Sequence, residues 1–224
     1  YHFVKEKVLR ESKKQVIIKT INKNQFLIGL FIGLWAGDGS RFVDRDAHTI
    51  KIHLDARDAK LVDFIGKVTQ SIFNKKGRFA REKTNNKASI IIISKFIYKF
   101  IDKYLVYGKN KTWTVRLKKE TFEYDKKFLD GFLIGMTLSD GFINDRFILN
   151  LTSQDLIKNN LTILNMLGYN PKTYTQVRAK YGWHDLHRLY LSKKETVMLK
   201  NFLNKLIKKI EINTDLDALK RYKQ

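Results

Sequence analysis

Two aspartates in matching sequence contexts carry the clearest chemical signal in this chain. Asp38 and Asp140 lie 102 residues apart, and each ends an apolar run and precedes a glycine that suits a left-handed helix cap. If the fold brings these carboxylates together without a neutralising partner, their mutual repulsion is costly, and a divalent cation removes it. The pair therefore predicts a metal site.

The segments before the two acids are an internal duplication. Phe26 to Gly39 (FLIGLFIGLWAGDG) and Phe128 to Gly141 (FLDGFLIGMTLSDG) share seven of their fourteen positions at one constant offset. An isolated Asp-Gly pair would most simply end a helix and begin a turn. Two copies at the ends of duplicated segments favour the metal site instead.

Each copy has small residues at a spacing of four, which predicts an amphipathic helix with one small-residue face. A glycine inside a helix costs about 1 kcal/mol relative to alanine, so two such faces need a packing reason. We expect the helices to pack backbone against backbone and in parallel, with both acids at one end. A membrane-spanning pair is excluded because a span needs about 20 apolar residues and each acid ends its run earlier. The predicted interface residues are Gly29, Gly33, Gly131 and Gly135.

Through FIGLWAGDG (Phe31 to Gly39) and LIGMTLSDG (Leu133 to Gly141), the chain resembles the LAGLIDADG homing endonuclease family in its single-chain, two-motif form. Both copies differ from the family motif at its sixth position, where Ala36 and Leu138 replace an acid. The resemblance implies that the motif acids bind a divalent metal, normally Mg²⁺, over the scissile phosphates. Mn²⁺ would substitute for Mg²⁺, and Ca²⁺ would bind without supporting cleavage.

The resemblance also implies roles for particular residues. Asp38 and Asp140 would be metal ligands, and Gly37 and Ser139, directly before them, are assigned to the same metal site. The family places polar or basic residues near the metals. By position, the candidates for a catalytic role are Gln154 and Lys109, then Lys111, with Lys208 or Lys209 suggested for the second half.

The composition points to a polyanionic partner. The 224 residues carry a formal net charge of +22, which would also suit a ribosomal or membrane-surface protein. A hydrophobic content of 43% and an aromatic content of 12% can support a packed core. Cysteine is absent, so disulfides, thiol catalysis and cysteine-based zinc sites are excluded. No secretory signal is recognised, and we expect an intracellular protein, either in a prokaryotic cytoplasm or in an organelle.

The pattern along the chain predicts an α+β protein of two tandem αββαββα half-domains related by pseudo-two-fold symmetry. Ile50, Ile52 and Leu54, for example, alternate with polar residues as in a half-buried strand. The motif helices would pack at the interface between the halves, and the antiparallel sheets would expose curved surfaces for DNA. The predicted divisions are an N-terminal extension (1–24), a first half-domain (25–107), a linker (108–124) and a second half-domain (125–224).

The exposed sheet faces carry the predicted DNA contacts. Arg and Lys can pair with guanine edges, Asn and Gln with adenine, and all of them can reach phosphates. The alternative for each residue is an ordinary solvated side chain. The candidates are Arg41, Arg45, Lys51, His53, Arg78, Arg81 and Lys83 in the first half, and Arg146, Asn150, Tyr174, Gln176, Arg178, Arg188 and Tyr190 in the second.

Three other residues that invite a functional role are left without one. Trp113 and Trp183 have no assigned chemistry, and His184 has no other ligand residue at a convincing metal spacing.

The sequence therefore predicts a monomeric, magnesium-dependent endonuclease that cuts both strands of a long, asymmetric double-stranded DNA site. Asymmetry follows because the halves differ at nearly every proposed contact, whereas a homodimer would read a palindrome-like site. The resemblance implies that an intron or an intein encodes the enzyme, and the lack of a visible splicing cysteine or flanking intein block favours an intron. Two alternatives stay open: an RNA maturase that binds intron RNA, and a non-catalytic DNA-binding protein of the same fold. No membrane partner is expected.

Overall fold

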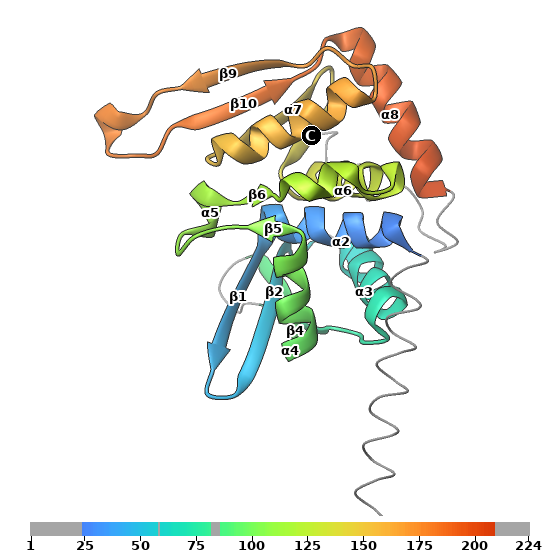
Figure 1. Ribbon diagram of the computed structural model, residues 1–224, viewed down its shortest axis with the longest axis vertical. Coiled ribbons are helices and arrows are strands. Elements are labelled where there is room, and N and C mark those ends of the chain that lie inside the picture. Colours follow the sequence, from blue (N-terminus) through green and yellow to red (C-terminus); the bar gives the residue numbers. More distant parts are fainter. Residues whose placement is uncertain (1–23, 58, 82–85, 209–224) are drawn as a thin grey trace, which may run out of the picture.

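The computed structural model describes residues 24–57, 59–81 and 86–208. Lys83, Lys209 and residues 1–23 of the predicted N-terminal extension lie outside these ranges. Two four-stranded antiparallel sheets, with helices packed on them, form two similar halves (Figure 1).

The first half follows the predicted αββαββα order. Its sheet has the strand order β1-β2-β4-β3. Ile50 and Ile52 on β2 pair with Ile92 and Ile90 on β4, and all four are buried on the face that carries the helices. The elements are α2 (Gln25–Asp38), β1 (Gly39–Asp44), β2 (Ala47–Asp55), α3 (Ala59–Phe73), β3 (Arg78–Arg81), β4 (Lys87–Ile93), α4 (Lys95–Phe100) and the short 3-10 helix η1 (Ile101–Lys103).

The second half repeats this order, with the sheet order β7-β8-β10-β9, and so confirms the predicted fold class. Asp125 accepts a hydrogen bond from the Lys127 amide, and Ser153 accepts one from the Leu156 amide, so both residues cap the helices that follow them. The elements are α6 (Lys126–Ser139), β7 (Gly141–Ile143), β8 (Phe147–Leu151), α7 (Gln154–Met166), β9 (Lys172–Gln176), η3 (Ala179–Tyr181), β10 (Leu186–Tyr190) and α8 (Lys193–Lys208).

Helix α2 differs from the predicted amphipathic helix. Every residue from Leu27 to Ala36 is buried, because α2 contacts α6 of the second half as well as α3, β1 and β2 of its own half. A helix that is apolar all round belongs in a core. One continuous hydrophobic core therefore joins the two halves. In the part of the chain that the structure describes, no helix is long and apolar enough to cross a membrane.

The stretch predicted as a linker contains short elements that the sequence did not reveal. Helix α5 (Lys111–Thr114) is followed by β6 (Arg116–Leu117), which pairs with β5 (Leu105–Val106), and then by η2 (Lys119–Glu123). The hydroxyl of Thr152, just before α7, donates a hydrogen bond to the carbonyl oxygen of Thr112 on α5. Helix α5 is therefore bonded to the second half as well as being continuous with the first.

Candidate metal centre and nucleic-acid interface

Helices α2 and α6 lie side by side and meet along their backbones (Figure 1). An added Cβ at Gly29 would lie 1.9 Å from the carbonyl oxygen of Phe128, and one at Gly131 would lie 2.0 Å from the carbonyl oxygen of Phe26. Since real Cβ atoms do not approach backbone oxygens this closely, the contact requires glycine. It fixes the positions of the acids at the helix ends. The same holds at the two remaining predicted interface positions, Gly33 and Gly135.

The two acids converge at the C-terminal ends of these helices. Asp38 is the last residue of α2, and Asp140 directly follows α6. An added Cβ at Gly37 would lie 2.2 Å from Oδ2 of Asp140 and 2.1 Å from Oγ of Ser139. The carboxylate from the second half therefore lies against the end of the helix from the first half.

The glycines after the acids are required by packing. Gly39 has φ −87° and ψ 149°, an extended conformation open to any residue, so the predicted left-handed cap is wrong there. An added Cβ at Gly39 would lie 2.3 Å from the carbonyl oxygen of Trp35, and one at Gly141 would lie 2.6 Å from Cα of Thr137. Each Asp-Gly pair thus forms a close-packed corner between a motif helix and the strand that follows it.

Asp140 lies in surroundings that suit a cation. Its Oδ2 atom is buried and has no hydrogen-bond partner among the residues that the structure describes. Burial raises the pKa of Asp140 to about 6, although Lys111 and Ser139 act to lower it. A buried carboxylate oxygen without a donor is costly unless a positive group meets it. Together with Asp38, it fits a hard divalent cation such as Mg²⁺, which needs few carboxylates and keeps several waters.

Lys111 on α5 places a positive charge at the same helix ends. Its Nζ atom donates to the carbonyl oxygens of Trp35, Ala36 and Gly37 at 2.9, 2.8 and 2.9 Å. These are among the last carbonyls of α2, where the helix dipole is negative. Burial lowers the pKa of Lys111 to about 8, while Asp140 and Asp38 act to raise it. The ammonium therefore offsets both the helix end and the acids.

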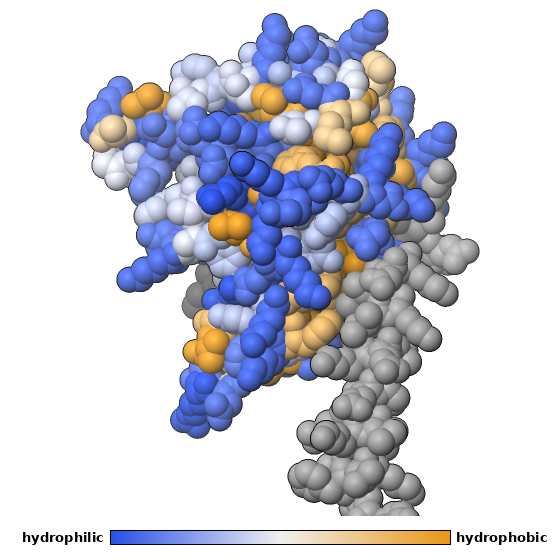
Figure 2. Space-filling model, in the orientation of Figure 1, coloured by the Kyte–Doolittle hydropathy of each residue, from blue (hydrophilic) through white to orange (hydrophobic). Residues whose placement is uncertain are grey.

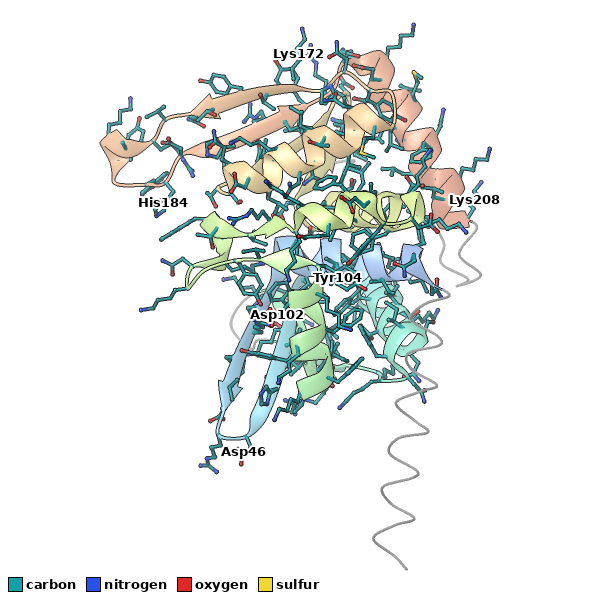
Figure 3. The ribbon with its side chains drawn as sticks, viewed as in Figure 1. Asp46, Asp102, Tyr104, Lys172, His184 and Lys208 are labelled. Atoms are coloured by element: carbon teal, nitrogen blue, oxygen red, sulfur yellow. The ribbon has the colours of Figure 1, made fainter. Side chains whose placement is uncertain are left out.

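The other predicted site residues are placed differently. Lys109 is exposed, so Lys111 and not Lys109 is the lysine that the structure brings to the acids. Gln154 is exposed at the first position of α7. The hydroxyl of Ser139 donates back to two carbonyls of its own helix. Lys208 ends α8 on the side of the molecule where α2 begins, away from the acids (Figure 3).

The strand register places three predicted DNA contacts of the first sheet on its open face, by which we mean the face away from the helices. Lys51 and His53 on β2 pair with Ile91 and Ser89 on β4, and Arg78 on β3 also pairs with Ile91. The three basic residues therefore point the same way.

The register contradicts the outward placement of Arg41 and Arg81. Arg41 points toward the helices, where its guanidinium forms an ion pair with Asp102 at 2.8 Å. Arg81 pairs with the buried Ala88 and points to the helix side of the sheet. Side chains alternate between faces along a strand, so Arg81, three residues after Arg78, cannot share its face.

Two of the predicted contacts in the first half, one on β2 and one in a turn, have environments that the sequence did not indicate. His53 forms hydrogen bonds with the hydroxyls of Ser40, at 2.8 Å, and Ser89, at 3.2 Å. Arg45 lies in the tight turn between β1 and β2, with a positive φ of 51°. Arg45 is exposed at the tip of this hairpin.

The second sheet places its predicted strand contacts on one open face. Arg188 pairs with Asn150 on one side and with Tyr174 on the other, and its Nε atom donates to Oδ1 of Asn150 at 2.8 Å. The same register puts Gln176 and Tyr190 on this face. DNA contact by any of these residues stays a prediction. The two predicted loop residues are Arg146, between β7 and β8, and Arg178, between β9 and β10.

Comparison with known proteins identifies this architecture. No family model matches the sequence, and no match was found among the curated proteins. A mesophilic variant of the homing endonuclease I-DmoI is 13% identical over 80% of this chain and 96% of that chain, with a TM-score of 0.62. I-DmoI in complex with DNA and Ca is also 13% identical, over 89% and 98% of the two chains, with a TM-score of 0.63.

A second kind of LAGLIDADG protein also matches. The N-terminal LAGLIDADG domain of DUF199/WhiA is 14% identical over 95% of this chain and 94% of that chain, with a TM-score of 0.54. At these identities the comparisons establish the fold. The chain has the two-domain LAGLIDADG fold, as the two sequence motifs predicted.

Proposed function

We propose that the protein is a metal-dependent endonuclease that cuts double-stranded DNA. The observation that carries the proposal is the convergence of Asp38 and Asp140 at the helix ends that also hold the Lys111 ammonium. Within the described part of the chain, Oδ2 of Asp140 has no hydrogen-bond partner. The fold supports it, because similar structures include the homing endonuclease I-DmoI in complex with DNA and Mn. Since one fold can serve several functions, the acid pair carries more weight than the fold.

Asp38 and Asp140 would hold the cation. We propose Mg²⁺ as the natural metal, Mn²⁺ as a substitute and Ca²⁺ as a cation that binds without supporting cleavage. A bound cation of this kind activates a water and stabilises the leaving oxygen of a phosphodiester. Within residues 24–57, 59–81 and 86–208, no three or more His, Cys, Asp or Glu side chains group into a metal site. Water and phosphate oxygens would therefore complete the coordination.

The target follows from the two open sheet faces. Lys51, His53 and Arg78 face outward from the first sheet, whereas Asn150 and Arg188 form a bonded pair on the second. Different residues on the two faces support a long and asymmetric DNA site. One chain supplies both acids, so we propose an active monomer. We also propose that an intron encodes the protein and that it works inside the cell. Intron RNA is a further substrate to test.

The experiment is selection of cleaved sites from a random duplex library in Mg²⁺, Mn²⁺, Ca²⁺ and EDTA. We expect double-strand cuts at one enriched, asymmetric sequence in Mg²⁺ and Mn²⁺, and binding without cutting in Ca²⁺. Tight binding with no cut in any metal would refute the nuclease proposal and favour the non-catalytic or maturase alternative. Binding to intron RNA would then be measured next.

Replacing Lys111 with methionine should lower the cleavage rate at the selected site by about 10²-fold. The Lys111 ammonium offsets the negative charges of Asp38 and Asp140, and methionine does not. Lys111→Met removes the ammonium that lowers the pKa of Asp140, so the pH at which cleavage begins should also move upward. Lys109→Met is the matched control: it removes an exposed lysine two residues away and should change the rate little. Equal losses in the two variants would argue against a specific role for Lys111.

A further inference from the structure

The loop between β9 and β10, residues 177–185, carries unusually exposed rings. We call this loop the arm tip, because β9 and β10 project from the body as an arm (Figure 1). Tyr181 is 59% exposed and Trp183 63% exposed, with their ring centroids 5.8 Å apart. In Figure 2 apolar residues gather at the outer end of the arm on a largely hydrophilic surface, and Val177 there is 67% exposed. Rings this exposed on a protruding loop indicate an interaction site.

Cationic side chains accompany both rings. The guanidinium of Arg178 lies 5.7 Å from the ring centroid of Trp183, and Nζ of Lys180 lies 4.9 Å from that of Tyr181. A partner that suits the arm tip must therefore offer flat apolar faces and negative charges at short intervals. A single strand of nucleic acid has this chemistry, since each nucleotide carries a base and a phosphate.

The arm tip is internally braced. The amide of Arg178 donates to Oδ1 of Asp185 at 3.0 Å, and its Nε atom donates to the carbonyl oxygen of His184 at 2.8 Å. The His184 ring lies 3.5 Å, between centroids, from the ring of Trp113 on α5. Figure 3 shows His184 on the edge of the arm that faces α5. This contact connects the arm tip to the same short helix that carries Lys111.

We propose that the arm tip binds an unpaired nucleotide, with its base against Tyr181 and Trp183 and its phosphates near Arg178 and Lys180. In a perfect duplex the base faces are stacked inside the helix, so exposed rings of this kind have nothing equivalent to contact. Base edges and paired phosphates suit the polar open faces of the sheets instead. The proposal goes beyond DNA cleavage, because single-strand binding at the arm tip does not require the protein to cut.

Tryptophan fluorescence tests the proposal directly. The chain has three tryptophans, of which Trp35 is buried, so Trp113→Phe leaves Trp183 as the only exposed one. A single-stranded oligonucleotide of about 12 thymidines should quench the Trp183 emission. A perfect, blunt-ended duplex of about 12 base pairs, made from two strands so that it has no unpaired loop, should leave it almost unchanged.

Variants then locate the site. In anisotropy measurements with the labelled oligonucleotide, Tyr181→Ala and Trp183→Ala should each weaken binding by roughly fivefold to a hundredfold. Phe79→Ala is the matched control, because it removes an exposed ring, 47% accessible, from the helix side of the first sheet. Lys180→Ala should weaken binding in low salt and lose its effect in high salt.

Three outcomes would overturn the proposal. The first is unchanged affinity in Tyr181→Ala and Trp183→Ala. The second is quenching of Trp183 by the perfect duplex as strongly as by the single strand. The third is quenching by vesicles rich in phosphatidylserine but not by the oligonucleotide, which would assign the arm tip to a membrane surface.

Discussion

Asp140→Asn is expected to lower the rate of DNA cleavage by at least about 10³-fold while leaving DNA binding in Ca²⁺ nearly unchanged. The amide is close in size to the carboxylate and should keep the packing against Gly37, where Oδ2 of Asp140 would lie 2.2 Å from an added Cβ. It lacks the negative charge that would hold the cation. Cleavage and binding at the library-selected site give the two measurements. Asp38→Asn should behave in the same way, because each half supplies one acid.

The same substitution should stabilise the protein in metal-free buffer above pH 6. Burial raises the pKa of Asp140 to about 6 from 3.8, so the folded wild type binds the proton more tightly than the unfolded chain. Wild-type stability contributed by this group is therefore present below about pH 4 and is lost as the pH rises to about 6. The amide does not ionise and escapes that loss, which is on the order of 2–3 kcal/mol.

Urea unfolding in EDTA at pH 4 and pH 7 measures this difference. Asp140→Asn and the wild type should nearly coincide at pH 4 and separate at pH 7, with the variant more stable. A variant less stable than the wild type at pH 7 would show that the ionised carboxylate is satisfied within the protein, and would weaken the case for a cation site.

Gly29→Ala and Gly131→Ala should have the largest effects on folding. Each added methyl would lie about 2 Å from a backbone carbonyl oxygen of the opposite motif helix, and backbone cannot rotate away as a side chain can. The helices would have to separate along the contact that joins the two halves. We expect each substitution to cost about 3 kcal/mol or more, a large part of the stability of an ordinary domain.

Gly66→Ala provides the control for helix glycines. Gly66 lies inside α3, and an added Cβ there would meet no atom of the described residues within 4 Å. Removing the backbone freedom of a helical glycine should raise the free energy of unfolding by about 0.5–1 kcal/mol. Urea unfolding of the three variants therefore separates the effect of helix propensity, seen at Gly66, from the effect of helix packing, seen at Gly29 and Gly131. Similar values for Gly29→Ala and Gly66→Ala would contradict the backbone contact between α2 and α6.

The fold and the acid pair were predictable because their signals are periodic and duplicated. Glycines four residues apart are costly in an exposed helix, so Gly29 and Gly131 required a close helix contact. The contact in turn required Asp38 and Asp140 to meet. Alternation along β2 similarly gave the correct faces for Lys51 and His53.

The remaining site residues depended on geometry that has no period. Helix α5 is four residues long, too short for a pattern, so nothing in the sequence ranked Lys111 above Lys109. Strand β1 begins at Gly39 directly after α2, without a loop. Its residues do not alternate between buried and exposed positions. The packed corner at Gly39 therefore sets which way Arg41 points. Only the structure, through the pairing of Arg41 with the buried Ile50 and its ion pair with Asp102, shows that the Arg41 side chain turns toward the helices.

The backbone contact between α2 and α6 divides the positions of the chain into two kinds: those that hold the acids in place and those on the open sheet faces. The positions of Asp38 and Asp140 depend on main-chain atoms meeting main-chain atoms, and on glycines that tolerate no side chain. The residues on the open sheet faces take no part in that contact. Under the proposed function, substitutions such as Asn150 or Lys51 to other polar residues would therefore change which sequence is read without moving the acids. If the protein is the endonuclease proposed above, its target can change by substitution on the sheets while the acid pair stays in place.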